Sequence, residues 1–474
     1  MRFSDLAACP GWTVHYNGYT LDWEKVAAQA CSLASAIEKR LSEPNKLTIF
    51  AASSPIEMLL SYFVASRLGL LAAILSRRSV EGFVQELDPG TIGLLVWPEV
   101  AANTPVSPEI PVVLVDWSNL DAPRGNQFAP QPGPQPARFV FSSSGSTGSP
   151  KRIVHDERRL IANAKMVADY LGLTASDRSF CVFPINYMYG LSTTLCALIT
   201  GGTIEYGDFR NPSLLTLQAD KCGSTVLPVI GDWATRLAAA WSSQQPPLRR
   251  IILNASDRLL KAQAAALLPH ASAFWNNFGQ TEAAPRLFAV QASPENLDAL
   301  CEDDQVAPGY LADPQIEARI GGCDADGYGA FSYRSPYAML GTMSASGALQ
   351  PAPEWIESGD LFRLETGGLY RWGGRVTHAV KHNGRFVPLR NIADRVLIHK
   401  AVTGVGIAKG ADGELTLFVE SPVAEQGLKQ ELHSIVSSEG NGFPVEIRVL
   451  PELPRTESGK VDARQLDRTY HGGL

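Results

Sequence analysis

Long uninterrupted hydrophobic runs are missing from this chain of 474 residues. The most apolar stretch, residues 58–75, reaches membrane-spanning length, but Ser61 and Arg67 interrupt it. The first eight residues lack the apolar core of a signal peptide. We therefore expect a cytoplasmic protein with no membrane partner, in which residues 58–75 form a buried helix followed by a short strand.

Metal-type cysteine spacing and basic runs are also missing. The seven cysteines form no Cys-x-x-Cys pair and have no close histidine partners, so neither a zinc site nor a disulfide framework is indicated. Reduced thiols in the cytosol fit this pattern. The formal net charge of -7, with no long basic run, argues against general nucleic-acid binding.

The composition predicts a globular protein, and the alternation of helix-like and strand-like segments predicts an α/β fold. A hydrophobic fraction of 45% and a charged fraction of 19% are typical of a globular protein with a large core. Helix-like and strand-like patches alternate over residues 21–268, which predicts two parallel sheets flanked by helices. From about residue 306, short strands with glycine turns predict a small β-barrel-like subdomain or an antiparallel sheet. The last hundred residues predict a small α+β domain.

One Ser/Gly-rich stretch, FSSSGSTGSPKRIV at residues 141–154, is suited to bind an anion. Glycines allow close backbone approach, amides and hydroxyls donate hydrogen bonds, and Lys151 supplies charge, so phosphate is the expected guest. The spacing differs from the phosphate loop of P-loop NTPases, which ends in Gly-Lys-Ser/Thr. A flexible linker is the alternative, but strand-like flanks at residues 138–141 and 151–154 favour strand, loop, strand.

Four further motifs follow the loop along the chain. They are NFGQTE at residues 277–282, SGD at 358–360, Gly374-Arg375 with Lys381 and Gly384, and PRTESGK at 454–460. In this order and spacing, the five motifs resemble the adenylate-forming superfamily of acyl-CoA synthetases, peptide-synthetase adenylation domains and luciferases. The resemblance covers residues 50–468 and is closest to a stand-alone acyl or aryl acid-AMP ligase. It implies an N-terminal adenylation domain at residues 1–375 and a mobile C-terminal domain at residues 376–474.

This resemblance implies a site for ATP and Mg²⁺. The loop would hold the β- and γ-phosphates, with Thr147 and Lys151 at its most recognisable positions. Phe278 stands where relatives usually place a tyrosine beside the adenine, and Thr281 would contact the α-phosphate. Glu282 would help to hold Mg²⁺, which commonly joins one carboxylate to substrate phosphates. The expected ATP-binding residues are Ser143, Ser144, Gly145, Ser146, Thr147, Gly148, Lys151, Asn277, Phe278, Gly279, Thr281, Asp360 and Arg375.

The later motifs would complete this site. Asp360 would receive the ribose hydroxyls, Arg375 would contact the ribose or phosphates, and Lys460 resembles the mobile catalytic lysine. Negative charge builds on both reacting oxygens when a carboxylate attacks the α-phosphate, and an ammonium group can neutralise it. Singly, Glu282 could cap a helix, Asp360 could be a turn residue before a strand, and Lys460 could be a solvated surface lysine. The combination favours catalytic roles for Lys460, Glu282 and Thr147.

Several positions depart from the family pattern. The expected hinge is Thr377, where relatives usually carry aspartate or lysine. Residues 254–256, Asn-Ala-Ser, replace a Gly-Gly-Ala segment that packs against adenine, and residues 390–392 replace an acidic helix start. Tyr187 stands where many acyl-CoA synthetases place a histidine. The nucleotide pocket and the hinge are therefore expected to differ in detail from those of relatives.

The segment at residues 184–190, PINYMYG, bears on the acid substrate. A buried ammonium needs an anionic partner, and Asn186 and Tyr187 offer hydrogen bonds without charge. We therefore expect a carboxylic acid without an α-amine, aryl or acyl, unless Asp232 points inward. The expected pocket residues are Asn186, Tyr187, Leu191, Trp233 and Ala284.

The resemblance implies a two-step reaction. The acid and ATP would give an acyl-adenylate and pyrophosphate, and a thiol of coenzyme A or of a carrier protein's phosphopantetheine would then take the acyl group. Residues 381–384 lack the Ser-Gly-Gly stretch common in coenzyme A ligases, which favours a carrier protein. Two alternatives stay open: an amino-acid-activating enzyme, and a catalytically inactive nucleotide-binding scaffold. The retained loop, Glu282, Asp360 and Lys460 argue against the scaffold.

Overall fold

A computed structural model of the chain describes most of its residues and divides into two compact units. The first unit comprises Met1–Glu317 and Arg334–Ile356, and the second comprises Ala318–Tyr333 and Glu357–Leu474. The described residues are 1–6, 11–41, 43–88, 90–99, 107–117, 133, 135–143, 151–207, 212–230, 237, 241, 248–376, 379–382, 385–397, 399–409, 415–422, 425–439, 445–454 and 461–471. The domain boundary expected after residue 375 stays a prediction.

An eight-stranded sheet forms one part of the first unit, in the order β21-β20-β8-β7-β4-β3-β5-β6. Its central strands are parallel, as the alternating pattern predicts, and β7, β8, β20 and β21 pair antiparallel. The strands are β3 (Leu47–Ala52), β4 (Leu71–Ser76), β5 (Ile92–Pro98), β6 (Val112–Val115), β7 (Arg138–Ser143), β8 (Lys151–Asp156), β20 (Gly341–Met343) and β21 (Leu349–Pro351). Every residue of β3 and β5 is buried, which is expected for central strands of a sheet whose two faces are covered.

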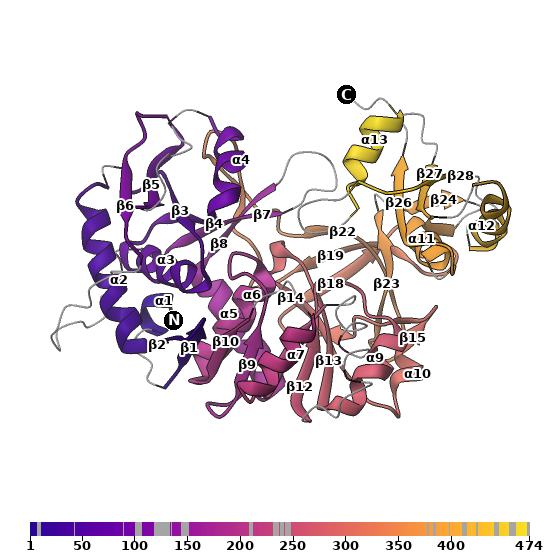
Figure 1. The fold of residues 1–474 in the computed structure, drawn as a ribbon, viewed down its shortest axis with the longest axis horizontal. Helices are drawn as coiled ribbons and strands as arrows, with labels where there is room; N and C mark the ends of the chain where they lie inside the picture. The colour runs from indigo at the N-terminus through magenta and orange to yellow at the C-terminus, as the bar shows by residue number, and fades with distance from the viewer. Residues whose placement is uncertain are drawn as a thin grey trace. The chain divides into compact units, whose positions relative to one another are not determined.

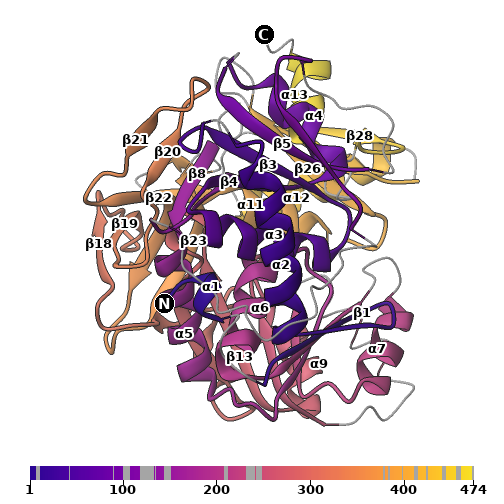
Figure 2. The ribbon, with the colours of Figure 1, turned by 90° about the vertical axis from the view of Figure 1, so that its left-hand side faces the viewer.

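Two helices beside this sheet show how short-range signals set element ends. Figures 1 and 2 both show α2 (Trp23–Glu38) and α3 (Pro55–Leu68) side by side. The hydroxyl of Ser54 accepts a hydrogen bond from the Glu57 backbone N–H at the start of α3, and Gly69 ends it with a φ of 66°. Helix α3 leads into β4, so the predicted buried helix and strand at residues 58–75 are confirmed.

A nine-stranded sheet forms the other part of the first unit, in the order β17-β14-β13-β12-β11-β9-β10-β1-β2. Its strands are β1 (Thr13–Tyr16), β2 (Tyr19–Asp22), β9 (Arg178–Cys181), β10 (Thr203–Tyr206), β11 (Val226–Val229), β12 (Arg249–Asn254), β13 (Ala271–Gly279), β14 (Arg286–Ala292) and β17 (Tyr310–Leu311). The helices between them include α5 (Glu157–Leu171), α6 (Met188–Thr200), α7 (Pro212–Lys221) and α9 (Lys261–Leu267). The predicted second helix-flanked sheet is confirmed. Its edge hairpin β1–β2 comes from the N-terminus, which local patterns did not indicate.

Short elements complete the first unit. They are α1 (Phe3–Leu6), η1 (Arg77–Ser79), α4 (Val80–Gln85), η2 (Leu268–His270), η3 (Thr281–Ala283), α10 (Leu297–Leu300), β15 (Cys301–Glu302) and β16 (Gln305–Val306).

The second unit begins with an open four-stranded sheet in the order β18-β19-β22-β23. These strands are β18 (Glu317–Gly321), β19 (Gly329–Arg334), β22 (Ile356–Leu364) and β23 (Tyr370–Arg375). Strands β18 and β23 stand at the two ends of the order, so within the described residues the sheet does not close. The β-barrel-like expectation is therefore wrong, and the antiparallel-sheet alternative holds.

The rest of the second unit is the predicted α+β region. It contains β24 (Ala379–His382), β25 (Arg385–Pro388), α11 (Leu389–Leu397), β26 (Gly404–Lys409), β27 (Leu415–Glu420), α12 (Glu425–Glu439), β28 (Glu446–Leu450) and α13 (Ala463–His471). Ile392, Leu417, Leu432 and Ile447 pack into one hydrophobic core between the helices and the three-stranded sheet β26-β27-β28. Mobility of this region stays a prediction.

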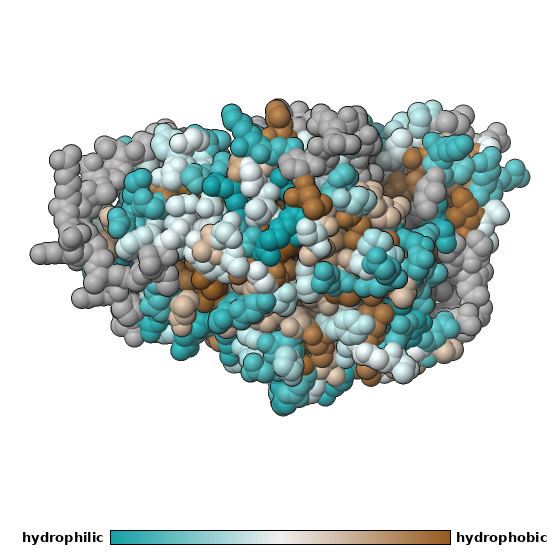
Figure 3. All heavy atoms as spheres, turned by 90° about the horizontal axis from the view of Figure 1, so that it is seen from below, coloured by the Kyte–Doolittle hydropathy of each residue, from teal (hydrophilic) through white to brown (hydrophobic). Residues whose placement is uncertain are grey.

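The surface mixes polar and apolar residues. On the face in Figure 3, hydrophobic residues are interspersed with hydrophilic ones. Among the described residues, no helix has both the length and the apolar character needed to cross a membrane.

Candidate functional site

The flanks of the Ser/Gly loop form the antiparallel pair β7–β8. Ser143 lies opposite Lys151 in this pair, and Lys151 is exposed. The predicted strand, loop, strand arrangement is therefore confirmed, and the tether alternative is wrong. The loop residues Ser144, Gly145, Ser146, Thr147 and Gly148 lie outside the described part of the chain, as do Lys460, Thr377 and Trp233. Their predicted roles stay predictions.

His155, on the strand that leaves the loop, contacts the NFGQTE motif. Its Nε2 lies 2.6 Å from the backbone oxygen of Thr281, and its ring is fully buried. Burial lowers the pKa of His155 to about 4, so the ring is neutral at pH 7. Since the carbonyl only accepts, Nε2 carries the proton and donates it to Thr281. This bond fixes β8 to the residue expected at the α-phosphate.

The NFGQTE motif lies where β13 ends and the short turn η3 begins. Phe278 pairs with Phe288 on β14, with ring centroids 5.9 Å apart. A Cβ on Gly279 would lie 1.4 Å from the Pro285 carbonyl oxygen, so only glycine fits there. Glu282 follows in the turn, and its backbone oxygen accepts a hydrogen bond from the Met339 N–H at 2.8 Å. Backbone contacts thus hold the segment that presents Thr281 and Glu282.

The side chain of Asn277 forms hydrogen bonds with other residues of the protein. The Tyr170 hydroxyl donates to Oδ1 of Asn277, and Nδ2 of Asn277 donates to the Asn254 carbonyl at 3.2 Å. Asn277 is buried, so these contacts join α5, β12 and β13 beneath the motif. This geometry supports a positioning role, and a direct contact with ATP stays a prediction.

The Asn-Ala-Ser segment at residues 254–256 is likewise held by side-chain contacts. Nδ2 of Asn254 donates to Oδ1 of Asn276 at 3.0 Å and to the Asp257 carbonyl at 3.2 Å. Ser256 has a φ of 69°, a left-handed value that glycine adopts at lower cost. The two asparagines tie the ends of the parallel strands β12 and β13 together.

In the second unit, Asp360 and Arg375 face each other across β22 and β23. They are direct partners in the strand register, and Arg375 Nε lies 3.1 Å from Asp360 Oδ1. Trp372 Nε1 donates to the same oxygen at 3.0 Å, and Asp360 is only 1% exposed. Asp360 lies inside β22, so its description as a turn residue before a strand is wrong. These two donors hold the Asp360 carboxylate in a fixed position, and its contact with the ribose hydroxyls stays a prediction.

The candidate acid-binding segment leads into α6. Tyr187 immediately precedes this helix and is 61% exposed, whereas Leu191 is buried within it. Oδ1 of Asn186 is buried and has no hydrogen-bond partner among the described residues. Ala284 is buried at the end of η3 with a φ of 66°. Their predicted role as the lining of one pocket remains a prediction.

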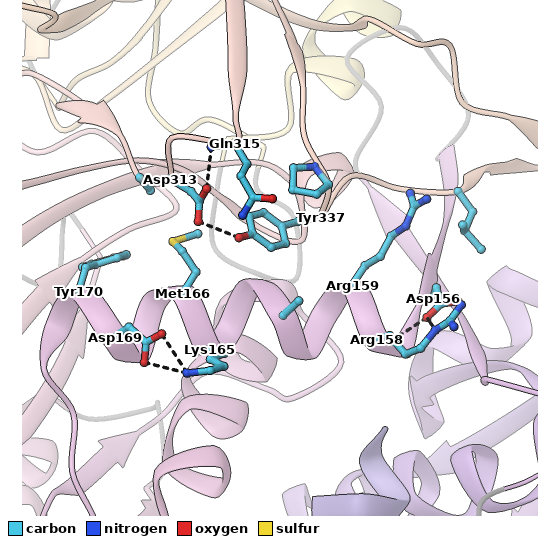
Figure 4. A pocket seen from close by; sticks show the side chains of 14 residues that line it. Asp156, Arg158, Arg159, Lys165, Met166, Asp169, Tyr170, Asp313, Gln315 and Tyr337 are labelled. Atoms are coloured by element: carbon cyan, nitrogen blue, oxygen red, sulfur yellow. Dashed lines mark hydrogen bonds and ion pairs between the residues drawn. The ribbon is translucent and has the colours of Figure 1, made fainter. Parts of the chain in front are cut away.

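A surface cavity of about 800 Å³ lies along α5 in the first unit, as seen in Figure 4. Four of its charged groups form two ion pairs: Lys165 with Asp169, at 3.0 Å, and Arg158 with Asp156, at 2.7 Å. None of the sequence-predicted site residues lines it. Because it lies apart from all of these residues, this cavity is a poor candidate for the phosphates of ATP.

The residues present fit Mg²⁺ held mainly by a substrate. Among the described residues, no group of three or more His, Cys, Asp or Glu side chains could hold a metal ion. Mg²⁺ in nucleotide sites usually takes one or two protein carboxylates together with phosphate oxygens and water. The single carboxylate of Glu282, held in η3, matches this donor set.

His155 gives a test of this region in solution. Its folded pKa of about 4 lies below the ordinary value of 6.5, so unfolding takes up a proton in this range. Stability should be full above pH 6.5 and fall by about 3 kcal/mol as the pH drops to 4. A His155→Gln variant keeps a donor but does not titrate, so denaturation profiles against pH should show a smaller acid loss. Identical acid losses in both proteins would contradict the assignment.

The chain is similar to known proteins over most of its length. The family described as AMP-binding enzyme matches residues 4–320 of the chain. The chain is 25% identical to the anthranilate-CoA ligase of Pseudomonas aeruginosa, over 97% of this chain and 94% of that protein. It is also 25% identical to the salicyl-AMP ligase / salicyl-S-ArCP synthetase of Mycobacterium tuberculosis, over 76% of this chain and 66% of that protein.

Solved structures share the fold. O-succinylbenzoate coenzyme A synthetase (MenE) from Bacillus subtilis, in complex with AMP, superposes with a TM-score of 0.81 at 18% identity, covering 100% of this chain and 99% of that one. The anthranilate CoA ligase AuaEII, in complex with anthranoyl-AMP, gives a TM-score of 0.74 at 17% identity, covering 99% and 97%. The predicted α/β architecture, apart from the barrel, is therefore confirmed.

Proposed function

Because this chain belongs to the AMP-binding enzyme family, we propose that it activates an aryl or acyl carboxylic acid without an α-amine. The products of the first step are an acyl-adenylate and pyrophosphate, and the acyl group then passes to a thiol. The observation that carries this proposal is the His155–Thr281 bond, which ties the strand leaving the Ser/Gly loop to the NFGQTE motif. Two segments 126 residues apart are thereby joined beside one expected phosphate site.

In the first half-reaction, a carboxylate oxygen of the acid attacks the α-phosphorus of ATP, and the bond to pyrophosphate breaks. The Ser/Gly loop would hold the departing phosphates, Thr281 the α-phosphate, and Lys460 would neutralise charge on the reacting oxygens. Mg²⁺ bound at Glu282 would screen the phosphate charge and orient the leaving group. The protein's task is positioning and charge stabilisation.

In the second half-reaction, the thiol sulfur attacks the acyl carbon, AMP leaves, and the thiol proton passes to solvent or a base. Coenzyme A and carrier proteins both present this thiol on a phosphopantetheine arm. The relatives bear names of both kinds, anthranilate-CoA ligase and salicyl-S-ArCP synthetase. The absence of a Ser-Gly-Gly stretch near residues 381–384 supports a carrier protein as acceptor.

ATP–pyrophosphate exchange against amino, aryl and fatty acids tests the first step. We expect exchange with aryl or acyl acids and none above background with amino acids, because Asn186 and Tyr187 place no anion beside an amine. Mass spectrometry of the adenylate formed from a mixed acid pool identifies the acid. Exchange confined to one amino acid would overturn the substrate class. Lack of pyrophosphate release with every acid would support the inactive scaffold instead.

A further inference from the structure

Arg286 is a buried arginine at the start of β14, directly after the segment that carries Thr281 and Glu282. It is only 3% exposed. The side chain of Asn163 on α5 holds its backbone: Nδ2 donates to the Arg286 carbonyl at 3.3 Å, and Oδ1 accepts from the Arg286 N–H at 3.4 Å. This clamp fixes the point from which the guanidinium extends.

The guanidinium has two tyrosine neighbours but no anionic one in the described part of the chain. Its central carbon lies 4.9 Å from the ring centre of Tyr189, and its side chain also makes a hydrogen bond with the neutral side chain of Tyr170. Among the described residues, its buried Nε has no hydrogen-bond partner. Two other buried arginines each have a carboxylate partner. Arg249 pairs with Asp220, and Arg371 pairs with Glu365. Arg286 is thus a buried cation whose counter-charge the described residues do not supply.

The titratable neighbours of Arg286 do not supply this charge either. Burial raises the pKa of the Tyr170 and Tyr189 phenols above their usual range, although the Arg286 charge opposes the rise. Burial likewise raises the pKa of Cys196 to about 12. All three groups are neutral at pH 7. A cation–π contact offsets only part of the cost of burying an ion.

The position of Arg286 links the nucleotide motif to the acid-binding segment. Tyr189 belongs to the same segment as Asn186 and Tyr187, and Arg286 follows Ala284 by two residues. Oδ1 of Asn186 is a second buried polar atom for which the described part of the chain provides no hydrogen-bond partner. An unpaired cation here would also repel the ammonium group of an amino acid, which agrees with the proposed substrate class.

From these contacts we propose that Arg286 binds a second anionic group on the acid substrate. The substrate class is then an aryl or acyl acid that carries another carboxylate or similar compact anion besides the reacting one. A guanidinium suits this role because it pairs with carboxylates through two parallel hydrogen bonds. The reacting carboxylate is a poorer partner, since the same pairing would occupy the oxygens that must attack phosphorus. This inference rests on the proposed function.

Matched acid pairs test the inference in the pyrophosphate exchange assay. Each dicarboxylic acid, aromatic or aliphatic, is compared with its half-amide, which has nearly the same shape and one charge fewer. For the wild type we expect at least one pair in which the diacid has a kcat/KM about 10²-fold higher, mainly through KM. The wild-type preference needs no variant, so misfolding cannot obscure it. A broad panel with no such pair would overturn the inference while leaving acid activation intact.

Substitution of Arg286 then identifies the cation responsible. Arg286→Met, similar in volume but neutral, should abolish the preference by lowering kcat/KM for the diacid about 10²-fold, with little change for the half-amide. Arg286→Lys should restore part of it. Arg78→Met, at an exposed arginine, is the matched control and should behave as wild type. Equal losses on both acids would assign Arg286 to the fold or to the reacting carboxylate. Lack of exchange with every acid would overturn the proposed function and this inference together.

Discussion

Replacing Lys460 with alanine is expected to slow acyl-adenylate formation about 10³-fold, while transfer from a supplied acyl-adenylate stays within about twofold of wild type. The difference follows from where charge develops. Attack on the α-phosphorus builds negative charge on the entering and leaving oxygens, which an ammonium group stabilises more in the transition state than in the ground state. Thiol attack on the acyl carbon occurs after pyrophosphate has gone, so it does not need this ammonium.

Two assays separate these half-reactions. Pyrophosphate exchange reports adenylation, and acylation of phosphopantetheine from a synthetic acyl-adenylate reports transfer. Lys400→Ala removes an exposed lysine from the same C-terminal region and should change neither rate. Equal loss of both activities in Lys460→Ala would contradict the proposed role and indicate a general effect on the fold.

Glu282→Gln is the second substitution with a large expected effect. Removing one negative charge while keeping the shape should lower the adenylation rate by about 10² to 10³-fold and raise the Mg²⁺ concentration needed for half-maximal rate. The fold should persist, since the structural contact of this residue is its backbone oxygen with the Met339 N–H. A titration of the exchange rate with Mg²⁺ at fixed ATP measures both changes.

The Mg²⁺ dependence distinguishes the role of Glu282 from that of Lys460. Lys460→Ala should lower the rate without moving the Mg²⁺ midpoint, because an ammonium does not coordinate a metal ion. Glu295→Gln, at an exposed glutamate, serves as the charge-matched control. An unchanged midpoint in Glu282→Gln would remove Glu282 from the metal site.

Local signals in the sequence were enough to place many elements. Helix α3 spans residues 55–68 because Ser54, Pro55 and Gly69 act within one turn of its ends. Helix α5 likewise spans residues 157–171, between the N-cap Asp156 and the left-handed Gly172. The strands on either side of the Ser/Gly loop were also predictable, because residues 138–141 and 151–154 are themselves strand-like. Closure of a barrel was not, because it depends on whether strands distant in the chain pair at their edges.

The sequence by itself determined the family, the order of its motifs and the α/β alternation, because those features are written in residues close together along the chain. Only the tertiary structure decided which side chains support them. His155 meets Thr281, Tyr170 meets Asn277, and Asn163 holds Arg286, each across more than 100 positions. A histidine, tyrosine or arginine in isolation has no periodicity that identifies its partner. The absence of a described counter-charge at Arg286 became visible only when the chain was folded around it, since burial is what makes an unpaired charge costly.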